Sequence, residues 1–151
     1  MKLLRILFIL IIAAFVVIQF FDIERDNPEF NQEDDLMTVE KPPAEVQKIL
    51  RATCYDCHSN ETQWPWYSYI APASWFVKQH VTDGRDNINL NFWGEYELED
   101  RAYMIKEMIE EVEEGEMPLP GYDIMHPDAR LTNEQKEVLF KWLRSIQKLE
   151  S

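Results

Sequence analysis

The sequence predicts an all-α domain behind an apolar N-terminal segment. Apolar residues recur with the period of one helix face in three stretches, and no stretch shows the alternation of a half-buried strand. The length of 151 residues allows one domain with an appendage. We assign residues 1–21 to the apolar segment, 22–41 to a linker and 42–151 to the domain.

The apolar segment carries positive charge at its start, from Lys2 and Arg5, and meets negative charge at Asp22. This asymmetry holds the N-terminus in the cytoplasm. We therefore expect one uncleaved transmembrane helix in a bacterial inner membrane, near the lower length limit for a span, with the domain in the periplasm. A cleaved signal peptide is the alternative, although no A-x-A-like cleavage site precedes Asp22.

The linker, residues 22–41, is acidic and has little aliphatic periodicity. Such a segment buries too little apolar surface to offset the entropy lost on ordering. The sequence therefore predicts a flexible tether between the apolar segment and the domain.

The domain opens with a helix after Pro42 and Pro43, which suit a first turn. Its apolar face leads into Cys54-Tyr-Asp-Cys57-His58, a C-x-x-C-H sequence that holds both cysteines of the chain. This is the attachment sequence of c-type haem. Cysteines three residues apart on a helical turn lie on one side, so both thiols can reach the porphyrin edge. His58 then becomes an axial ligand of the iron.

Other uses of the two cysteines explain the motif less well. A disulfide gives His58 no role, and a thioredoxin-like pair needs a βαβ context. A zinc site needs two further ligands at regular spacing, whereas His80 and His126 are scattered. We therefore expect one covalent haem c per chain, bound by Cys54 and Cys57.

An aromatic run follows, broken by prolines, with a helix expected from Pro72 to about Thr82 and ended by Gly84. Its rings are candidates for the haem wall, with ordinary core packing as the alternative. Arg85 is a candidate partner of a haem propionate, or a surface arginine paired with a neighbouring aspartate. The wall candidates are Trp64, Trp66 and Trp75.

Two helices are expected in the C-terminal half. Residues 99–114 have one apolar face and one glutamate-rich face, and Gly115 ends this helix. The glutamate-rich face is either solvated or a docking patch for a cationic partner. In the last helix, Thr132 is the N-cap and Gln135 its capping-box partner. The expected buried stripe of the last helix is Leu139, Trp142, Leu143 and Ile146.

The loop between these helices contains Met117, followed by Pro118. The second axial ligand must come from a segment that folds over the other haem face, and a late loop satisfies this requirement. We expect Met117 in this role, because Pro118 fixes the backbone directly after it and so helps to hold the sulfur in place. A thioether is also a soft ligand that favours ferrous iron. The alternatives are His126, His80, Met125 or an open position.

Several motifs together resemble the small bacterial haem-binding domain family: CYDCHSNET, WPWYSYIAPASW, a Gly-Arg step, LNFW and GEMPLPGY. The resemblance covers about residues 41–149. It implies a covalent haem and a role in electron transfer. The helix order and the Met-Pro loop are also similar to those of cytochrome c, so a cytochrome c-like fold is expected.

The net charge of −13 excludes nucleic acid as a partner and favours a redox protein with a basic docking surface. The sequence therefore predicts a membrane-tethered monohaem cytochrome that carries single electrons on the periplasmic side. A haem enzyme of the peroxidase type, with an open distal position, is one alternative. A haem-based redox or gas sensor is the other.

Overall fold

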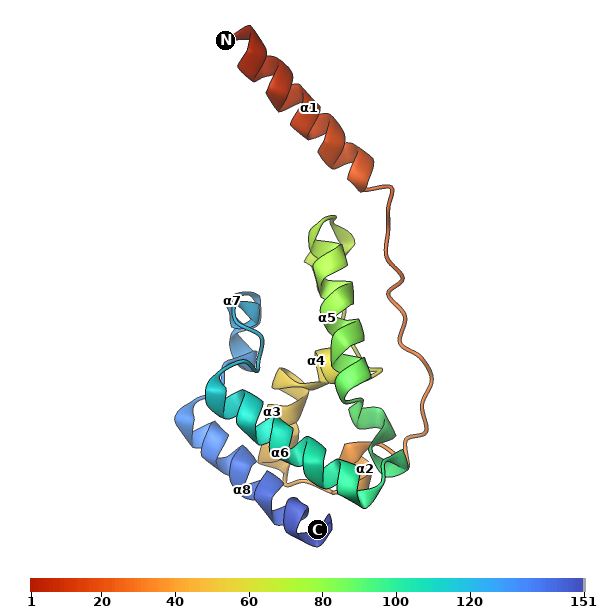
Figure 1. Ribbon diagram of the computed structural model, residues 1–151, viewed down its shortest axis with the longest axis vertical. Helices are drawn as coiled ribbons and strands as arrows, with labels where there is room; N and C mark the ends of the chain where they lie inside the picture. Colours follow the sequence, from red (N-terminus) through yellow and green to blue (C-terminus); the bar gives the residue numbers. More distant parts are fainter. Residues whose placement is uncertain (151) are drawn as a thin grey trace.

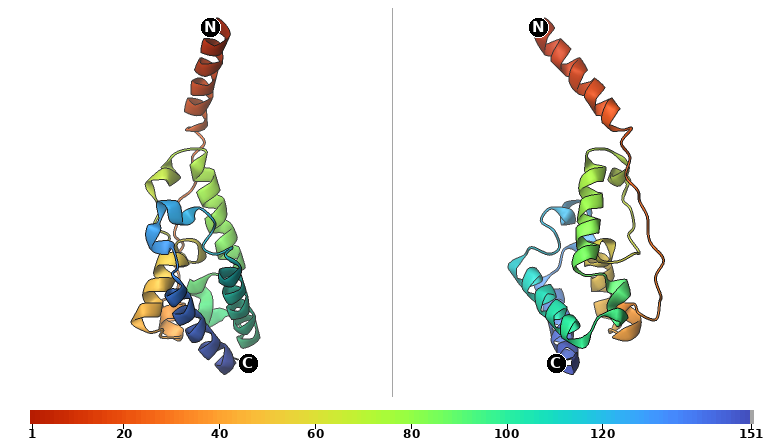
Figure 2. Two further views of the ribbon diagram at one scale, coloured as in Figure 1. Left: turned by 90° about the vertical axis from the view of Figure 1, so that its left-hand side faces the viewer. Right: turned by 45° about the vertical axis from the view of Figure 1, so that its right-hand side comes forward.

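Helices account for all regular secondary structure in the computed structural model, which describes the backbone of residues 1–150; residue 151, assigned to the domain above, lies outside the described residues. This confirms the all-α prediction. Figures 1 and 2 show one helix standing away from a bundle formed by the others. The α-helices are α1 (Lys2–Ile18), α2 (Leu36–Val39), α3 (Ala44–Thr53), α4 (Tyr55–His58), α5 (Ala73–Asn87), α6 (Leu98–Glu114), α7 (Tyr122–Met125) and α8 (Asn133–Glu150), with 3-10 turns η1 (Trp66–Tyr69), η2 (Leu90–Glu95) and η3 (Pro127–Ala129).

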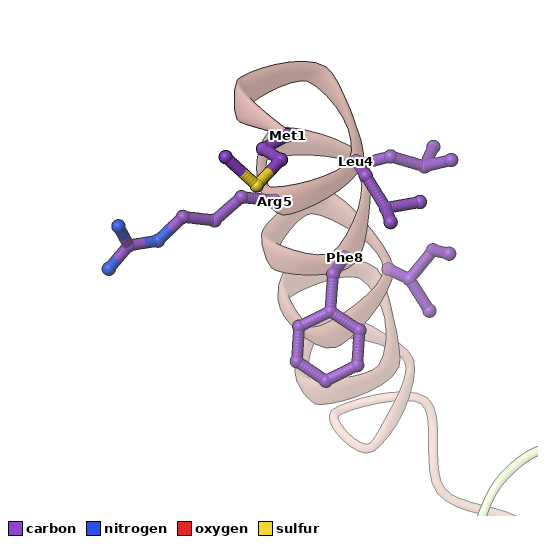
Figure 3. Close-up of a pocket in the computed structure, with 6 residues that line it drawn as sticks. Met1, Leu4, Arg5 and Phe8 are labelled. Carbon is purple, nitrogen blue, oxygen red and sulfur yellow. The ribbon is translucent and has the colours of Figure 1, made fainter.

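The isolated helix, α1, has no buried residue. Its side chains stand out from the backbone with no other element beside them, as Figure 3 shows for Leu4 and Phe8. Within residues 1–150, no helix is long and apolar enough to cross a membrane. The transmembrane helix expected over residues 1–21 is therefore not supported, because α1 contains only 17 residues and ends at Ile18.

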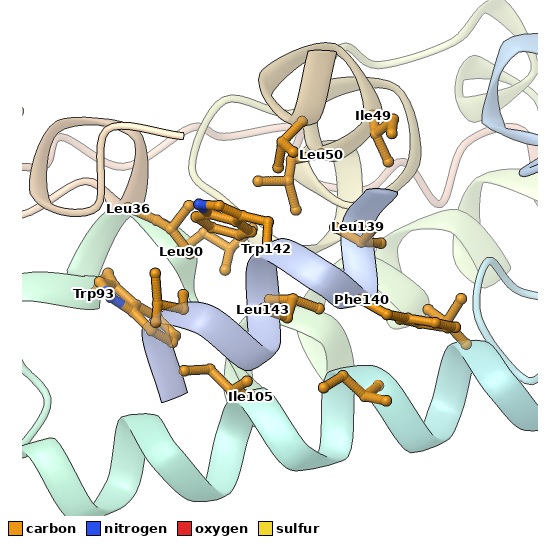
Figure 4. Packing of buried hydrophobic residues seen from close by; sticks show 14 of the residues in the cluster. Leu36, Ile49, Leu50, Leu90, Trp93, Ile105, Leu139, Phe140, Trp142 and Leu143 are labelled. Carbon is orange, nitrogen blue, oxygen red and sulfur yellow. The ribbon is translucent and has the colours of Figure 1, made fainter. Parts of the chain in front are cut away.

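The core lies where α8 packs against α6 on one side and against α3 on the other (Figure 4). The predicted stripe of α8 is buried as expected, and α6 contributes Ile105, Ile109 and Val112. Trp93 of η2 is fully buried against them. This burial of large apolar side chains is the main contribution to the stability of the domain.

Local signals set the ends of these helices as predicted. Thr132 and Gln135 form a capping box: the Thr132 amide donates to Gln135 Oε1 at 2.9 Å, and the Gln135 amide donates to Thr132 Oγ1 at 3.2 Å. Gly115 ends α6 in the left-handed conformation, with φ 83°.

Helix α5 is longer than the sequence predicts, because it continues through Gly84 to Asn87. The prediction that Gly84 ends this helix is wrong. A Cβ at Gly84 would lie 2.7 Å from the carbonyl oxygen of Cys57. Glycine is present here because α4 and its motif pack directly on the backbone of α5.

Residues 22–41, predicted to be a flexible tether, make many contacts with the domain. Asp35 is fully buried and caps α2 by accepting from the Met37 amide at 2.9 Å. Its carboxylate also accepts from Tyr55 Oη at 3.1 Å and Asn91 Nδ2 at 2.7 Å. Leu36, next to it, is fully buried in the core. The second half of this segment is therefore part of the folded domain, through contacts distant in sequence that periodicity does not reveal.

Candidate functional site

The motif forms the single turn of α4, directly after α3. Cys54 is the junction between the two helices. Its carbonyl accepts from the amides of Cys57 at 3.2 Å and His58 at 2.8 Å. This turn sets the Cys57 and His58 side chains against α5, where Gly84 permits the close approach.

The imidazole of His58 is oriented by the backbone. Its Nδ1 lies 3.2 Å from the carbonyl oxygen of Ile88, which can only accept a hydrogen bond. Nδ1 therefore carries the proton, and Nε2 is left as the basic nitrogen. The pKa of His58 lies below its usual value, because the effect of burial outweighs the opposing effect of hydrogen bonding with the backbone at Ile88 and Gly84. A neutral imidazole held through one nitrogen is the arrangement of a metal-ligating histidine.

The two cysteines differ in their surroundings, and both are free thiols. Cys57 lines the cavities described below, and burial, with the nearby Asp56 carboxylate, raises the pKa of its thiol to about 11. Cys54 packs against the hydrophobic core, with its Sγ 3.2 Å from Thr53 Oγ1. Burial raises the pKa of the Cys54 thiol as well.

Two adjoining cavities open between the α4–α5 pair and the loop that contains Met117. Their volumes are about 150 Å³ and about 270 Å³. The smaller one has His58 and Met117 in its walls, and the larger one has Tyr67 and Phe76. The side chains that line both are Asp56, Cys57, His80, Leu119 and Tyr122.

These walls suit a flat apolar ligand with a central metal. A basic imidazole and a thioether contribute to the same cavity, and a thiol lies beside them. The rest of the lining is largely apolar, with a few polar groups, as in most cofactor sites. The residues present therefore fit a haem, with His58 and Met117 available to the iron.

The alternative ligands are placed differently from one another. His80 lines both cavities, and Met125 lines the larger one. His126 lines neither: its Nε2 lies 2.7 Å from Tyr67 Oη, and its ring stacks on Tyr122 with 4.1 Å between ring centres. His80 and Met125 thus remain beside the site, whereas His126 is engaged by two tyrosines.

The three tryptophans expected to wall the haem do not line these cavities. The Trp64 Nε1 is buried without a hydrogen-bond partner among the described residues. Trp66 is 67% exposed, and Trp75 donates to the carbonyl of Phe21 at 3.0 Å. The aromatic rings in the walls are instead Tyr67, Phe76 and Tyr122. The aromatic run and the GEMPLPGY stretch contain these residues, but only the packing of η1 and α7 selects them.

Arg85, the candidate for a propionate, lines neither cavity. Its Nε donates to the Ser59 carbonyl at 2.8 Å. Its Nη2 donates to Thr62 Oγ1 and to Asn27 Oδ1, each at 3.0 Å. Arg85 therefore ties the segment 22–41 to the chain that follows the motif.

A hydrogen bond joins the motif to the loop across the cavities. The hydroxyl of Tyr122 donates to Asp56 Oδ2 at 2.9 Å. The other oxygen of Asp56 accepts from the Gln63 amide at 2.9 Å. Burial and the Asp56 carboxylate raise the pKa of Tyr122, so it stays a donor. This bond, which sequence reasoning missed, holds α7 and the adjoining Met117 loop over α4.

A family model described as a haem-binding domain matches residues 13–145. No curated protein and no solved structure matches the chain. Among residues 1–150, no group of three or more His, Cys, Asp or Glu side chains is arranged to hold a metal ion. The matched range includes the motif, both cavities and the Met117 loop.

Proposed function

The chain belongs to the haem-binding domain family, and on this premise we propose that it is a monohaem c-type cytochrome carrying single electrons on the outer side of a bacterial inner membrane. One observation carries the proposal. An imidazole with Nδ1 bonded to the backbone, and a methionine from a distant loop, line the same cavity beside the second cysteine of the motif.

Covalent attachment through both thiols is part of the proposal. Cys57 already lies in the cavity wall, and Thr53, next to Cys54, lines the smaller cavity. When bound, haem supplies a one-electron change at iron, with a potential set by axial ligands, burial and hydrogen bonds. The chain contributes the oriented imidazole of His58 and the soft thioether of Met117, which favours the ferrous state relative to a second histidine.

An open-site haem protein, whether a peroxidase-type enzyme or a sensor, is the second candidate. The observation that favours it is His80, an exposed side chain that lines both cavities. A polar group at that position could exchange a proton with a small substrate. The two candidates differ in whether the sixth position of the iron is filled.

Optical spectra of the purified haem protein in both oxidation states, with and without carbon monoxide, test the proposal. We expect the weak sulfur-to-iron charge-transfer band in the oxidised protein and slow binding of carbon monoxide. Met117→Ala should remove the band, lower the potential and open the iron to carbon monoxide. Met108→Ala, on α6 against the core, is the control and should keep the band.

Three results would reassign the site. If Met117→Ala leaves the spectrum unchanged while His126→Ala abolishes the low-spin state, His126 is the ligand. The same outcome for His80 or Met125 identifies that residue. Rapid binding of carbon monoxide by the unaltered protein favours the open-site candidate.

The proposed partner is a redox protein with a basic docking surface, because the chain carries a net charge of −13. One face of α6 is rich in glutamate, including Glu110 and Glu113, and is exposed. Electron exchange with a basic cytochrome should slow as ionic strength rises, since screening weakens such encounters. An exchange rate independent of salt would contradict this part of the proposal.

The proposed location rests on the positive N-terminal flank and on the apolar segment 1–21. Recovery of the protein with its N-terminus intact in the membrane fraction, with the domain sensitive to protease added from the periplasmic side, would support it. A soluble mature protein that begins after about Phe21 would exclude an anchor.

A further inference from the structure

Much of the aromatic run after the motif is exposed at one end of the domain. The run occupies η1, the turn after it and the start of α5. Several large apolar side chains exposed within one short stretch often mark an interaction site. The exposed fractions are Trp66 67%, Tyr69 61%, Ile70 38%, Trp75 39% and Phe76 63%.

The same end of the domain receives the end of α1. Gln19 exchanges two hydrogen bonds of 3.0 Å with the backbone of Ala71, and Trp75 Nε1 donates to the Phe21 carbonyl at 3.0 Å. Phe20 and Phe21, which are 83% and 65% exposed, thereby extend the aromatic surface. We call these seven side chains, from Phe20 to Phe76, the aromatic patch.

The helix beyond the patch points away from the domain, as Figures 1 and 2 show. Its only charged side chains are Lys2 and Arg5 at the far end, and it has no buried residue. A helix that is apolar on all sides requires an apolar environment. The patch thus lies at the boundary between an element that suits an apolar phase and a domain that suits water.

We propose that the aromatic patch is a docking site for a phospholipid surface, with its rings at the level of the headgroups and α1 in the apolar layer beyond. Trp and Tyr favour this level because each combines an apolar ring with a polar group. This inference rests on the proposed membrane location, concerns the orientation of the domain and does not depend on the haem.

The charges beside the patch are compatible with a lipid surface although the whole chain is acidic. Arg25 lies over the Tyr69 ring, 4.2 Å from its centre, and pairs with Asp22. Lys78 pairs with Asp26 at 2.9 Å. These two pairs cancel, and the exposed Glu24 adds one negative charge beside Phe21. A zwitterionic surface carries no net charge to repel it, so the apolar rings determine the contact.

Docking would also set the position of the candidate site. Phe76 belongs to the patch and lines the larger cavity. The bilayer surface would therefore lie beside that cavity, and the glutamate-rich face of α6, in another part of the domain, would stay in water.

Hydrogen exchange of the full-length haem protein, with and without phosphatidylcholine vesicles, tests the proposal. We expect vesicles to slow exchange of the amides in residues 66–76 and to leave those in residues 101–114 unchanged. The triple variant Trp66→Ser, Tyr69→Ser, Phe76→Ser should lose this protection but still sediment with vesicles, because α1 is intact. Leu98→Ser with Tyr103→Ser, which removes two exposed apolar side chains from α6, is the matched control.

Two outcomes would overturn the inference. In the first, vesicles protect α1 but not residues 66–76, so that the patch stays in water. In the second, residues 66–76 become protected without lipid as protein concentration rises, which assigns the patch to a second copy of the chain. If the Leu98→Ser, Tyr103→Ser control also loses the protection of residues 66–76 by vesicles, the effect of the triple variant is not specific to the patch, which also counts against the inference.

Discussion

Gly84→Ala should destabilise the domain although alanine is the better helix former. The new Cβ would lie 2.7 Å from the Cys57 carbonyl oxygen, where ordinary contact begins at 3.4 Å. The Cys57 carbonyl is a backbone group, so it cannot move aside as a flexible side chain could. We therefore expect the upper half of the usual cost of overpacking, about 2–3 kcal/mol. Replacing a glycine inside a helix recovers about 1 kcal/mol. The net loss is about 1–2 kcal/mol, equivalent to a melting temperature lower by roughly 2–8 °C.

Thermal unfolding of the haem protein, followed by circular dichroism, measures this loss. Thr82→Ala, an exposed position on the same helix, is the control and should stay within about 0.5 kcal/mol of the unaltered protein. The Gly84 variant should also contain less haem per chain, because the added methyl group pushes α4 and its motif away from α5. A melting temperature equal to or above that of the unaltered protein would refute the close packing of α4 on α5.

Three other substitutions test the rest of the structure. Tyr122→Phe removes the 2.9 Å hydrogen bond to Asp56, so it should weaken the sulfur-to-iron band and speed carbon monoxide binding. The control Tyr103→Phe, at an exposed tyrosine of α6, should do neither. Cys54→Ala with Cys57→Ala should leave an apoprotein that unfolds without a cooperative transition, because the cavity walls lose their partner atoms; native-like melting would contradict this. Asp35→Ala removes a helix cap and the acceptor of two side chains, so urea unfolding should show a loss of about 3 kcal/mol, and a loss below about 1 kcal/mol would mean that the carboxylate is dispensable.

The parts of the fold that the sequence predicted well depend on neighbouring residues. The apolar stripe of α8, the capping box at Thr132 and the left-handed end of α6 at Gly115 each involve residues within a few positions of one another. The C-x-x-C-H motif is equally local, since one helical turn sets its geometry. Such features follow from helix period and backbone conformation, which a short stretch of sequence specifies.

Other features of the site depend on which distant segments meet. In the sequence, Gly84 suggests the end of a helix. In the structure, it lies inside α5, where the absence of a Cβ allows the Cys57 carbonyl to pack against it. The exposure of Trp66 and the place of Tyr67 in the cavity wall differ although the residues are adjacent, because η1 turns one ring outward and the other inward.

The sequence by itself determined the helical class, the end of α6 at Gly115, the start of α8 at Thr132 and the presence of a haem-attachment motif. Only the tertiary structure decided that Met117 lines a cavity with His58, that Tyr122 bonds to Asp56, and that residues 22–41 pack on the domain. The physical reason is that helix formation is governed by contacts three or four residues apart. Cavity walls and long-range hydrogen bonds instead depend on the packing of whole elements, where shape and burial select among many compatible partners.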